Sequence, residues 1–227
     1  MAGSSWESFE EEHLKRFFSH FNVDCVFDVG ANRGQYRSLV RDRIGFKGPI
    51  ISFEPVPSLV SELNALKTRA NDTNWYIENI ALDRTAGEAE FNVMANNTFS
   101  SLMTPSHADV SIFKDMNKVL SVIQVKKEKF SDQYEKYKAL LNFKKPFLKM
   151  DTQGNDVAVF EGAGPSVKEL VGLQSELSIR KIYENTLYYY EVLDFYTKNG
   201  FVLSALVPNN AGHFPDLIEI DCIMYRK

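Results

Sequence analysis

The stretch VFDVGANRGQY, residues 26–36, begins as an apolar run and becomes polar after Gly30. A second short apolar run, PIISFEP at residues 49–55, follows a polar segment of helical length at residues 35–43. Two such runs joined by a helix are typical of a βαβ unit with parallel strands. The loop after the first strand then lies at the carboxyl edge of the sheet, where open α/β folds bind their ligands.

The rest of the chain repeats this alternation of strand and helix patterns. Further strands are predicted at residues 75–82, 87–94, 119–125, 146–151, 172–177, 201–207 and 218–225. Apolar spacings of three and four residues predict helices at residues 7–21, 58–70, 130–141, 155–162 and 188–199. Ser58 is expected to be the N-cap of the second of these helices. We therefore expect an α/β protein, with an N-terminal capping helix at residues 1–22 before a single domain at residues 23–227.

The composition indicates one sizeable core and no broad affinity for nucleic acid. The 227 residues are 44% hydrophobic and 25% charged, which is ordinary for a globular domain. The formal net charge of -4 leaves no excess of Lys and Arg to replace the counterions of a nucleic acid. We expect a small-molecule or carbohydrate partner and no nucleic acid, and the sequence leaves open whether the chain forms a homo-oligomer.

The chain shows no pattern of export or of membrane insertion. The first residues lack the apolar core of a signal peptide, and no apolar run approaches the ~20 residues of a membrane span. We expect no membrane span and a cytoplasmic location. Cys25 and Cys222 each lie in an apolar run, and neither has a Cys or His at metal-ligand spacing, so buried free thiols and no metal site are predicted.

The turn at Gly30 departs from the dinucleotide-binding fingerprint. That fingerprint has a middle glycine where the backbone approaches a pyrophosphate. Here the spacing is Gly30-x-x-x-Gly34, with Asn32 in the middle position. Asp28 adds a carboxylate that would repel phosphate. NAD or FAD is therefore the weaker interpretation of this turn.

Five stretches together carry a resemblance to a known family: FDVGANRGQY, ISFEPVPSLVSELNAL, NIALDRTAGEAEFNV, SSL and LKMDTQGNDVAVFEGA. From about residue 25 to the C-terminus, the chain resembles the FkbM family of S-adenosylmethionine-dependent methyltransferases. The resemblance implies a Rossmann-like class I methyltransferase fold: a seven-stranded, mostly parallel sheet with helices on both faces and an antiparallel last strand. It also implies S-adenosylmethionine as the methyl donor and, as the acceptor, a hydroxyl of a sugar, glycoside, polyketide-type product or similar small molecule.

The first βαβ unit suits this cofactor. Glu54 ends the second strand, where a carboxylate can accept both ribose hydroxyls, although a plain strand-ending turn would look the same. Gly30 and Gly34 allow a methionine tail to lie against the backbone, with Asp28 near its ammonium group. Cofactor binding is the favoured interpretation because the two features occur together at βαβ distance.

The resemblance extends the set of cofactor residues. In the resembling pattern Asp83 reaches the adenine amino group, while an ordinary Asp-initiated turn is the alternative. The remaining cofactor contacts that it implies are Asn32, Tyr36, Pro55, Ala81, Leu82, Ser101 and Asp151. The chain departs from the family pattern at Thr152-Gln153-Gly154, where Val-Glu-Gly is common. The missing charge weakens any proposal of a divalent metal.

Candidate catalytic residues follow two later strands. Asp151 and Glu176 end adjacent predicted strands, which would direct two carboxylates at one crevice. One could take the proton of the acceptor hydroxyl, and the other could orient the acceptor. The alternative for Asp151 is a cap of the helix near Asn155. His107 is a further candidate base in the polar segment at residues 95–109, which is either a mobile loop near the site or a surface excursion.

Two other functions stay open. An NAD-dependent oxidoreductase would use Glu54 for the ribose, but Asn32 and the lack of a Tyr-x-x-x-Lys pair disfavour it. A catalytically silent module would keep the cofactor pocket without turnover, because a cofactor motif indicates binding only.

Overall fold

The structure is a computed structural model that describes residues 5–209 and 215–227. Within these residues, seven strands form one sheet in the order β3-β2-β1-β7-β8-β10-β9. The strands are β1 (Cys25–Val29), β2 (Ile50–Phe53), β3 (Trp75–Glu78), β7 (Pro146–Met150), β8 (Gly172–Ser178), β9 (Phe201–Asn209) and β10 (Glu219–Arg226). Neighbouring strands run parallel except at β10, which is antiparallel to both β8 and β9. The predicted mostly parallel sheet with an antiparallel last strand is confirmed.

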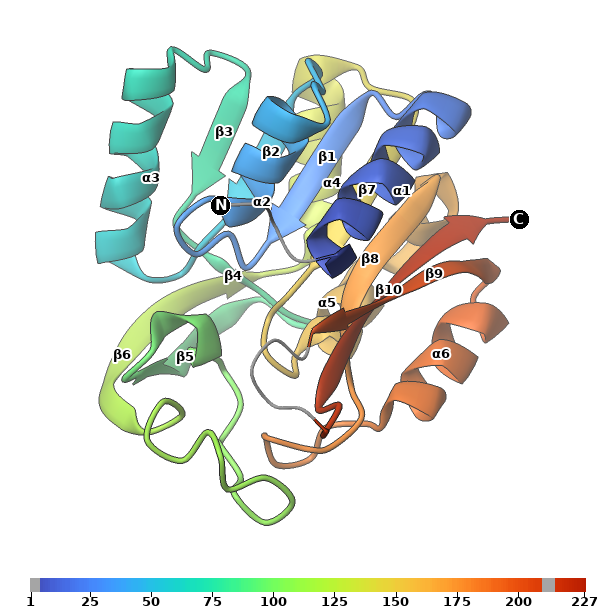
Figure 1. The fold of residues 1–227 in the computed structure, drawn as a ribbon. Coiled ribbons are helices and arrows are strands. Elements are labelled where there is room, and N and C mark those ends of the chain that lie inside the picture. The colour runs from blue at the N-terminus through green and yellow to red at the C-terminus, as the bar shows by residue number, and fades with distance from the viewer. Residues whose placement is uncertain (1–4, 210–214) are drawn as a thin grey trace.

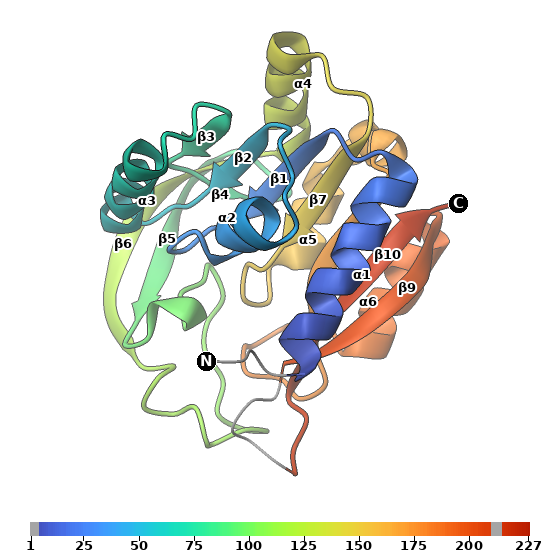
Figure 2. The ribbon, with the colours of Figure 1, turned by 45° about the horizontal axis from the view of Figure 1, so that its top comes forward.

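Helices cover both faces of this sheet, as the resemblance implied (Figures 1 and 2). On one face lie α1 (Ser5–Phe21), α2 (Gln35–Ser38) and α3 (Pro57–Ala70). On the other face lie α4 (Phe130–Leu141), α5 (Asp156–Gly162) and α6 (Tyr189–Lys198). A π-helical turn, Leu39–Arg43, extends α2, and 3-10 helices occupy Asn97–Phe99 and Gly164–Glu169. In Figure 2, α1 lies over the sheet between β7 and β10 and runs roughly along the strands.

The central strands are apolar on both sides because helices cover both sides. On the α1 side, Leu14 and Phe17 are buried with Phe147 of β7, and the ring centroids of Phe17 and Phe147 are 5.4 Å apart. On the α4 side, the ring of Phe27 of β1 lies 5.0 Å from that of Phe130. Each fully buried side chain of this kind stabilises the fold by roughly 1.5–3 kcal/mol. The two cores therefore hold the sheet firmly between its helices.

A second, three-stranded sheet lies beyond the carboxyl ends of the first strands (Figure 1). It consists of β4 (Ala81–Leu82), β5 (Gly87–Met94) and β6 (Val119–Glu128). The prediction of one strand at residues 75–82 is therefore wrong, because β3 stays in the main sheet and β4 joins the small one. Asn79 lies at the break, where its side-chain amide donates to the carbonyls of Glu54 and Pro55 at 3.0 and 2.9 Å.

The start of α3 also differs from the prediction. The helix begins at Pro57 with Val56 as its N-cap, so Ser58 lies inside the helix and is not its cap. Proline is favoured at the first helical position because its fixed φ suits the helix and its missing N–H needs no partner there.

Three other predictions can be compared with the described residues. The predicted capping segment at residues 1–22 contains α1, and its residues 1–4 lie outside the described residues. Cys25 and Cys222 are buried free thiols, as predicted. In the part of the chain that the structure describes, no helix is long and apolar enough to cross a membrane.

Candidate functional site

A cavity of about 530 Å³ lies at the carboxyl edge of the sheet, where the strand order reverses between β1 and β7. Its volume is in the range of small-molecule and cofactor sites. Parallel strands bring residues from distant parts of the sequence to this edge. The predicted site residues that line the cavity are Gly30, Asn32, Tyr36, Glu54, Pro55, Ala81, Leu82, Asp151 and Glu176.

The turn after β1 comes close to the end of β7. Gly30, Asn32 and Gly34 have φ angles of 82°, 47° and 82°. A Cβ atom on Gly30 would lie 1.9 Å from the carbonyl oxygen of Asp151, so only glycine fits there. A Cβ atom on Gly34 would lie 3.1 Å from the side chain of Leu63 in the core. Gly30 therefore shapes the cavity, whereas Gly34 permits the packing of α2.

Glu54 follows β2 and lines the cavity, although only 4% of its surface is exposed. Its Oε2 accepts the backbone N–H of Asn32 at 2.8 Å, and its Oε1 accepts that of Val56 at 2.9 Å. Burial raises the pKa of Glu54 to about 7, although these two hydrogen bonds oppose the rise. The bonds fix the carboxylate beside the turn and leave each oxygen able to accept a further donor.

A buried ion-pair network lies beneath the turn. Lys149 of β7 places its Nζ 3.4 Å from Asp28 Oδ1 and 3.5 Å from Asp151 Oδ2. Burial disfavours the ammonium, but the carboxylates of Asp151 and Asp28 outweigh it and raise the pKa of Lys149. Asp28 is fully buried and also accepts from Ser52 Oγ at 2.9 Å. The carboxylate of Asp28 is therefore paired with Lys149 and Ser52, which are side chains of neighbouring strands.

Gln153 connects the two carboxylates that were expected to converge. Its Nε2 donates to Asp151 Oδ1 at 3.0 Å and to Glu176 Oε2 at 2.7 Å, so both amide hydrogens are used. Its Oε1 lies 2.9 Å from the hydroxyl of Tyr183. The structure thus brings Asp151 and Glu176 together at one amide group.

The side chain of Asp151 is available to the cavity rather than to a helix end. Asn155 precedes α5 as its N-cap residue. The backbone N–H of Thr152 donates to Asp156 Oδ1 at 2.8 Å. The Asp151 side chain is 41% exposed and lines the cavity. The helix-capping alternative for Asp151 therefore does not describe this structure.

Further polar residues line the cavity beyond those that the sequence predicted, among them Glu10, Lys149, Gln174, Glu219 and Asp221. Burial raises the pKa of Glu219 and of Asp221. Three of the strand runs, PFLKMD, GLQSEL and IEIDCIMY, contain a charged or amide residue inside an apolar pattern. Burial of such a residue is unfavourable unless the residue is paired or binds a ligand. A polar residue inside an apolar run was therefore the sequence feature that could have indicated these site residues. Glu10 lies on α1 and had no comparable signal.

Five predicted site residues do not line the cavity: Asp28, Gly34, Asp83, Ser101 and His107. Asp83 Oδ2 instead lies 2.5 Å from the Nζ of Lys127 in β6. Ser101 is buried and donates to the carbonyls of Thr152 and Gln153, which holds the loop after β7 in place. His107 lies six residues after Ser101 and is partly exposed.

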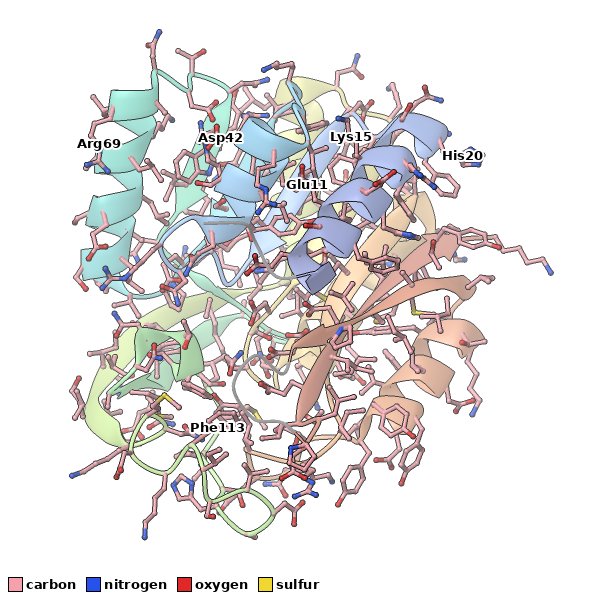
Figure 3. The ribbon with its side chains drawn as sticks, in the orientation of Figure 1. Glu11, Lys15, His20, Asp42, Arg69 and Phe113 are labelled. Carbon is pink, nitrogen blue, oxygen red and sulfur yellow. The ribbon has the colours of Figure 1, made fainter. Side chains whose placement is uncertain are left out.

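The polar segment after β5 forms part of the cavity wall. Residues 97–100 and Leu102 line the cavity, together with Phe113 further along the chain. Figure 3 shows Phe113 in the segment between β5 and β6. The ring centroids of Phe99 and Phe113 are 5.1 Å apart. The segment at residues 95–109 is therefore more than a surface excursion, because part of it lines the cavity.

The strand order, the antiparallel seventh strand and the cavity at the point of reversal define a Rossmann-like α/β fold of the class I methyltransferase type. Residues 28–203 match the family model described as "Methyltransferase FkbM domain", and the chain belongs to this family. The family that the sequence motifs predicted is confirmed.

Solved structures agree on the fold. The methyltransferase FkbM from Methylobacillus flagellatus KT is 15% identical, with a TM-score of 0.54 over 90% of this chain and 44% of that one. The magnesium protoporphyrin IX methyltransferase from Synechocystis PCC 6803, solved with bound SAM, is 8% identical, with a TM-score of 0.54 over 98% of this chain and 80% of that one. This chain thus spans less than half the length of the FkbM structure. No curated protein matches the sequence.

Proposed function

We propose that this protein is an S-adenosylmethionine-dependent methyltransferase that methylates a hydroxyl of a sugar, glycoside or similar small molecule. Its membership of the FkbM methyltransferase family supports methyl transfer. The observation that carries the proposal is that Gly30 and Glu54 line one cavity where the strand order reverses. Ligands of doubly wound folds bind at this point.

The residues at the ends of β1 and β2 fit S-adenosylmethionine. Glu54 has lone pairs left over from its two backbone hydrogen bonds, which suits two ribose hydroxyls. Gly30 presents bare backbone to a ligand, and Ala81 and Leu82 offer apolar surface for an adenine ring. When bound, the cofactor supplies an electrophilic methyl group on a sulfonium.

Asp151 is the proposed general base. Positioning supplies much of the rate of a displacement between two bound reactants, but the acceptor hydroxyl must still lose its proton. Lys149 and Gln153 hold the Asp151 carboxylate from two sides. Burial and the neighbouring Glu219 carboxylate raise the pKa of Glu176 well above its ordinary value. Glu176 therefore suits the orientation of the acceptor better than the removal of its proton.

A small-molecule acceptor suits this chain better than a nucleic acid. The net charge is -4. In the described part of the chain, the cavity lining contains six carboxylates and a single lysine. Such a surface offers phosphate groups almost no cationic partner.

Calorimetry tests the cofactor proposal directly. We expect S-adenosylmethionine and its demethylated product to bind in roughly the micromolar range, and NAD not to bind. Glu54→Gln keeps the shape of the side chain but removes its charge, and it should weaken binding about tenfold or more. Glu88→Gln, on an exposed residue of β5, is the matched control. Binding of NAD without S-adenosylmethionine would overturn the proposal.

Turnover needs a second experiment. Labelled S-adenosylmethionine is incubated with a panel of glycosides and hydroxylated small molecules, and methyl incorporation is read by mass. We expect a product with a methylated oxygen. Cofactor binding without a methylated product from any acceptor would instead indicate a silent binding module.

A further inference from the structure

The cavity has two ends that the strand order keeps apart. Gly30 and Glu54 follow β1 and β2, whereas Glu219 and Asp221 lie in β10, on the far side of β7. Because β10 is antiparallel, its first residues lie at the carboxyl edge of the sheet. We call this second end the acidic end of the cavity, and its residues are Glu10, Tyr36, Gln174, Glu176, Glu219 and Asp221.

The register of the sheet places like charges side by side at the acidic end. Asp221 pairs directly with Glu176 across the antiparallel β8–β10 ladder. Glu219, two residues earlier on β10, has its side chain on the same face. Like charges directly opposite each other are unfavourable in an antiparallel pair. A ligand that offsets this repulsion would account for the arrangement.

The side-chain amide of Gln174 is a second, independent indication of a ligand at the acidic end. The residue is 3% exposed, and its Nε2 donates to Glu10 Oε1 at 2.7 Å, which fixes the direction of the amide. Its Oε1 has no hydrogen-bond partner among the residues that the structure describes. An unpaired buried polar atom is destabilising, and a carbonyl oxygen can only accept. The missing partner of Gln174 is therefore a hydrogen-bond donor.

The hydroxyl of Tyr36 is another buried polar group without a hydrogen-bond partner among the described residues. Tyr36 is 7% exposed, lines the cavity, and has no hydrogen-bond partner for its hydroxyl within residues 5–209 and 215–227. The nearby carboxylates of Glu10 and Asp221 contribute, after burial, to a pKa of Tyr36 well above its ordinary value. Tyr36 and Gln174 thus both lie near the carboxylate of Glu10, and each has one polar atom without a partner among the described residues.

The protein itself supplies less positive charge than negative charge to the acidic end: the charge of Lys149 lowers the pKa of Glu10 and Asp221, and that of Arg43 lowers the pKa of Glu10, but burial outweighs both. Lys149 is the one cationic side chain among the described lining residues, and its ion pairs at 3.4 and 3.5 Å are with Asp28 and Asp151. Burial, as the largest cause, raises the pKa of Glu10, Glu219 and Asp221. A bound cation would favour their ionised forms.

We propose that the acidic end binds a protonated amine of the acceptor, so that the substrate of this enzyme is an amino sugar or another amine-bearing polyol. This inference rests on the proposed methyltransferase function. An ammonium group has three N–H donors and no acceptor, which complements the carboxylates and Gln174 Oε1. A metal ion is the weaker candidate, because the described residues contain no group of three or more His, Cys, Asp or Glu side chains suited to one.

Matched acceptors test the proposal. The probes are methyl glycosides of aminodeoxy sugars with the amine at different ring positions, each compared with its N-acetyl derivative, which has lost the charge. Calorimetry in the presence of the demethylated cofactor measures their binding, and labelled S-adenosylmethionine measures methyl incorporation. We expect the preferred amine to bind roughly 10- to 100-fold more tightly than its N-acetyl derivative.

Two variants connect the preference to the acidic end. Asp221→Asn removes one charge without a change of shape and should reduce the amine preference about tenfold or more, while the cofactor affinity stays unchanged. Gln174→Met removes the unpaired acceptor and is a second, independent variant in the same direction. Asp132→Asn, on an exposed residue of α4, is the control for the loss of an aspartate charge.

Each outcome has a defined meaning. Equal binding of amines and N-acetyl derivatives by the wild type would overturn the inference. An Asp221→Asn variant that loses cofactor affinity would also overturn it, because the cation at the acidic end would then be the ammonium of the cofactor. Methylation that a chelator abolishes and Mg²⁺ restores would point to a metal site instead.

The inference and the proposed function fail in different ways. Selective amine binding without methyl transfer to any acceptor would support the amine site and reject the enzyme. Methyl transfer without any amine preference would do the reverse.

Discussion

Gln153 gives one hydrogen bond to each of two neighbouring carboxylates and carries no charge of its own. A glutamate here, as in the Val-Glu-Gly pattern common in the family, would add a third carboxylate beside Asp151 and Glu176 and remove both donors. The amide therefore allows the two acids to share one point of the cavity. It positions them, and in the proposed function contact with the acceptor falls to Asp151 and Glu176.

Replacement of Asp151 tests its role as the base. Asp151→Asn keeps the shape of the side chain but removes its basicity, so turnover should fall by roughly 10²–10⁴. Cofactor affinity, measured by calorimetry, should change little. Glu176→Gln should instead raise KM more than it lowers kcat, because the proposed role of Glu176 is to orient the acceptor.

His107→Ala is the informative comparison for this pair. His107 does not line the cavity, so the variant should keep near wild-type turnover. Full activity of both carboxamide variants together with an inactive His107→Ala would mean that the loop histidine takes the proton.

The raised pKa of Glu54 predicts a pH dependence of cofactor binding. Burial raises this pKa to about 7, with Asp28 adding to the rise and Lys149 opposing it. Below that pH the carboxyl is protonated and is a poorer acceptor for ribose hydroxyls. The Kd of S-adenosylmethionine should therefore increase as the pH falls below 7, by up to about tenfold per pH unit. Calorimetry on Glu54→Gln, in which this slope should disappear, provides the check.

The connection between α2 and β3 depends on a buried cluster of charges. Asp72 Oδ2 accepts from Arg37 Nη2 at 2.7 Å and from Arg41 Nε at 2.9 Å, and all three side chains are less than 10% exposed. Arg37 also lies over the ring of Trp75 at 5.3 Å. The cluster fixes α2 and its π-helical turn against the start of β3, and thereby supports the turn that lines the cavity.

Loss of Asp72 should therefore destabilise the fold. Asp72→Asn leaves two buried guanidinium groups without their carboxylate, which should cost about 3–5 kcal/mol in the free energy of unfolding. Asp42→Asn is the matched control, because Asp42 also pairs with Arg37 but its side chain is 61% exposed. Its loss should cost about 0–1 kcal/mol. Urea denaturation compares the two, and equal losses would contradict the role of the buried cluster.

The elements of the main sheet could be predicted because buried parallel strands leave short apolar runs between turn residues. The break at Asn79, where the chain passes from the main sheet to the small sheet, could not be predicted. The apolar run at residues 75–82 looks the same whether it forms one strand of one sheet or two strands of two sheets. The start of α3 required a choice between Ser58 as a cap and Pro57 as the first helical residue, and the fixed φ of proline decided it.

Part of the candidate site followed from local patterns, and part depended on packing. Glu54 and Gly30 belong to one βαβ unit, whose geometry places both at the sheet edge. Glu10 reaches the cavity only because α1 packs over the sheet, and Asp221 only because β10 runs antiparallel. Neither relation is encoded in the spacing of nearby residues.

The buried carboxyl groups of the cavity should make the whole molecule most stable in mildly acidic solution. In the unfolded chain these groups titrate near their ordinary values, whereas burial raises the pKa of Glu54, Glu176 and Asp221 in the folded protein. The folded state therefore binds more protons above pH ~4.5. The carboxyl groups of Asp72 and Glu169 have lowered pKa values, so their stabilisation is lost only at lower pH.

The free energy of unfolding should accordingly fall as the pH rises from about 5 to 8. For Glu54, a folded pKa of about 7 against an ordinary value of 4.5 corresponds to roughly 3 kcal/mol, present below pH 4.5 and lost by the time the pH has passed 7. Urea denaturation at a series of pH values measures the slope. Glu54→Gln, which cannot ionise, should flatten the slope, whereas Glu88→Gln should leave it unchanged. A wild-type stability that rises between pH 5 and pH 8 would show that the cavity carboxylates are already ionised and paired in the folded protein.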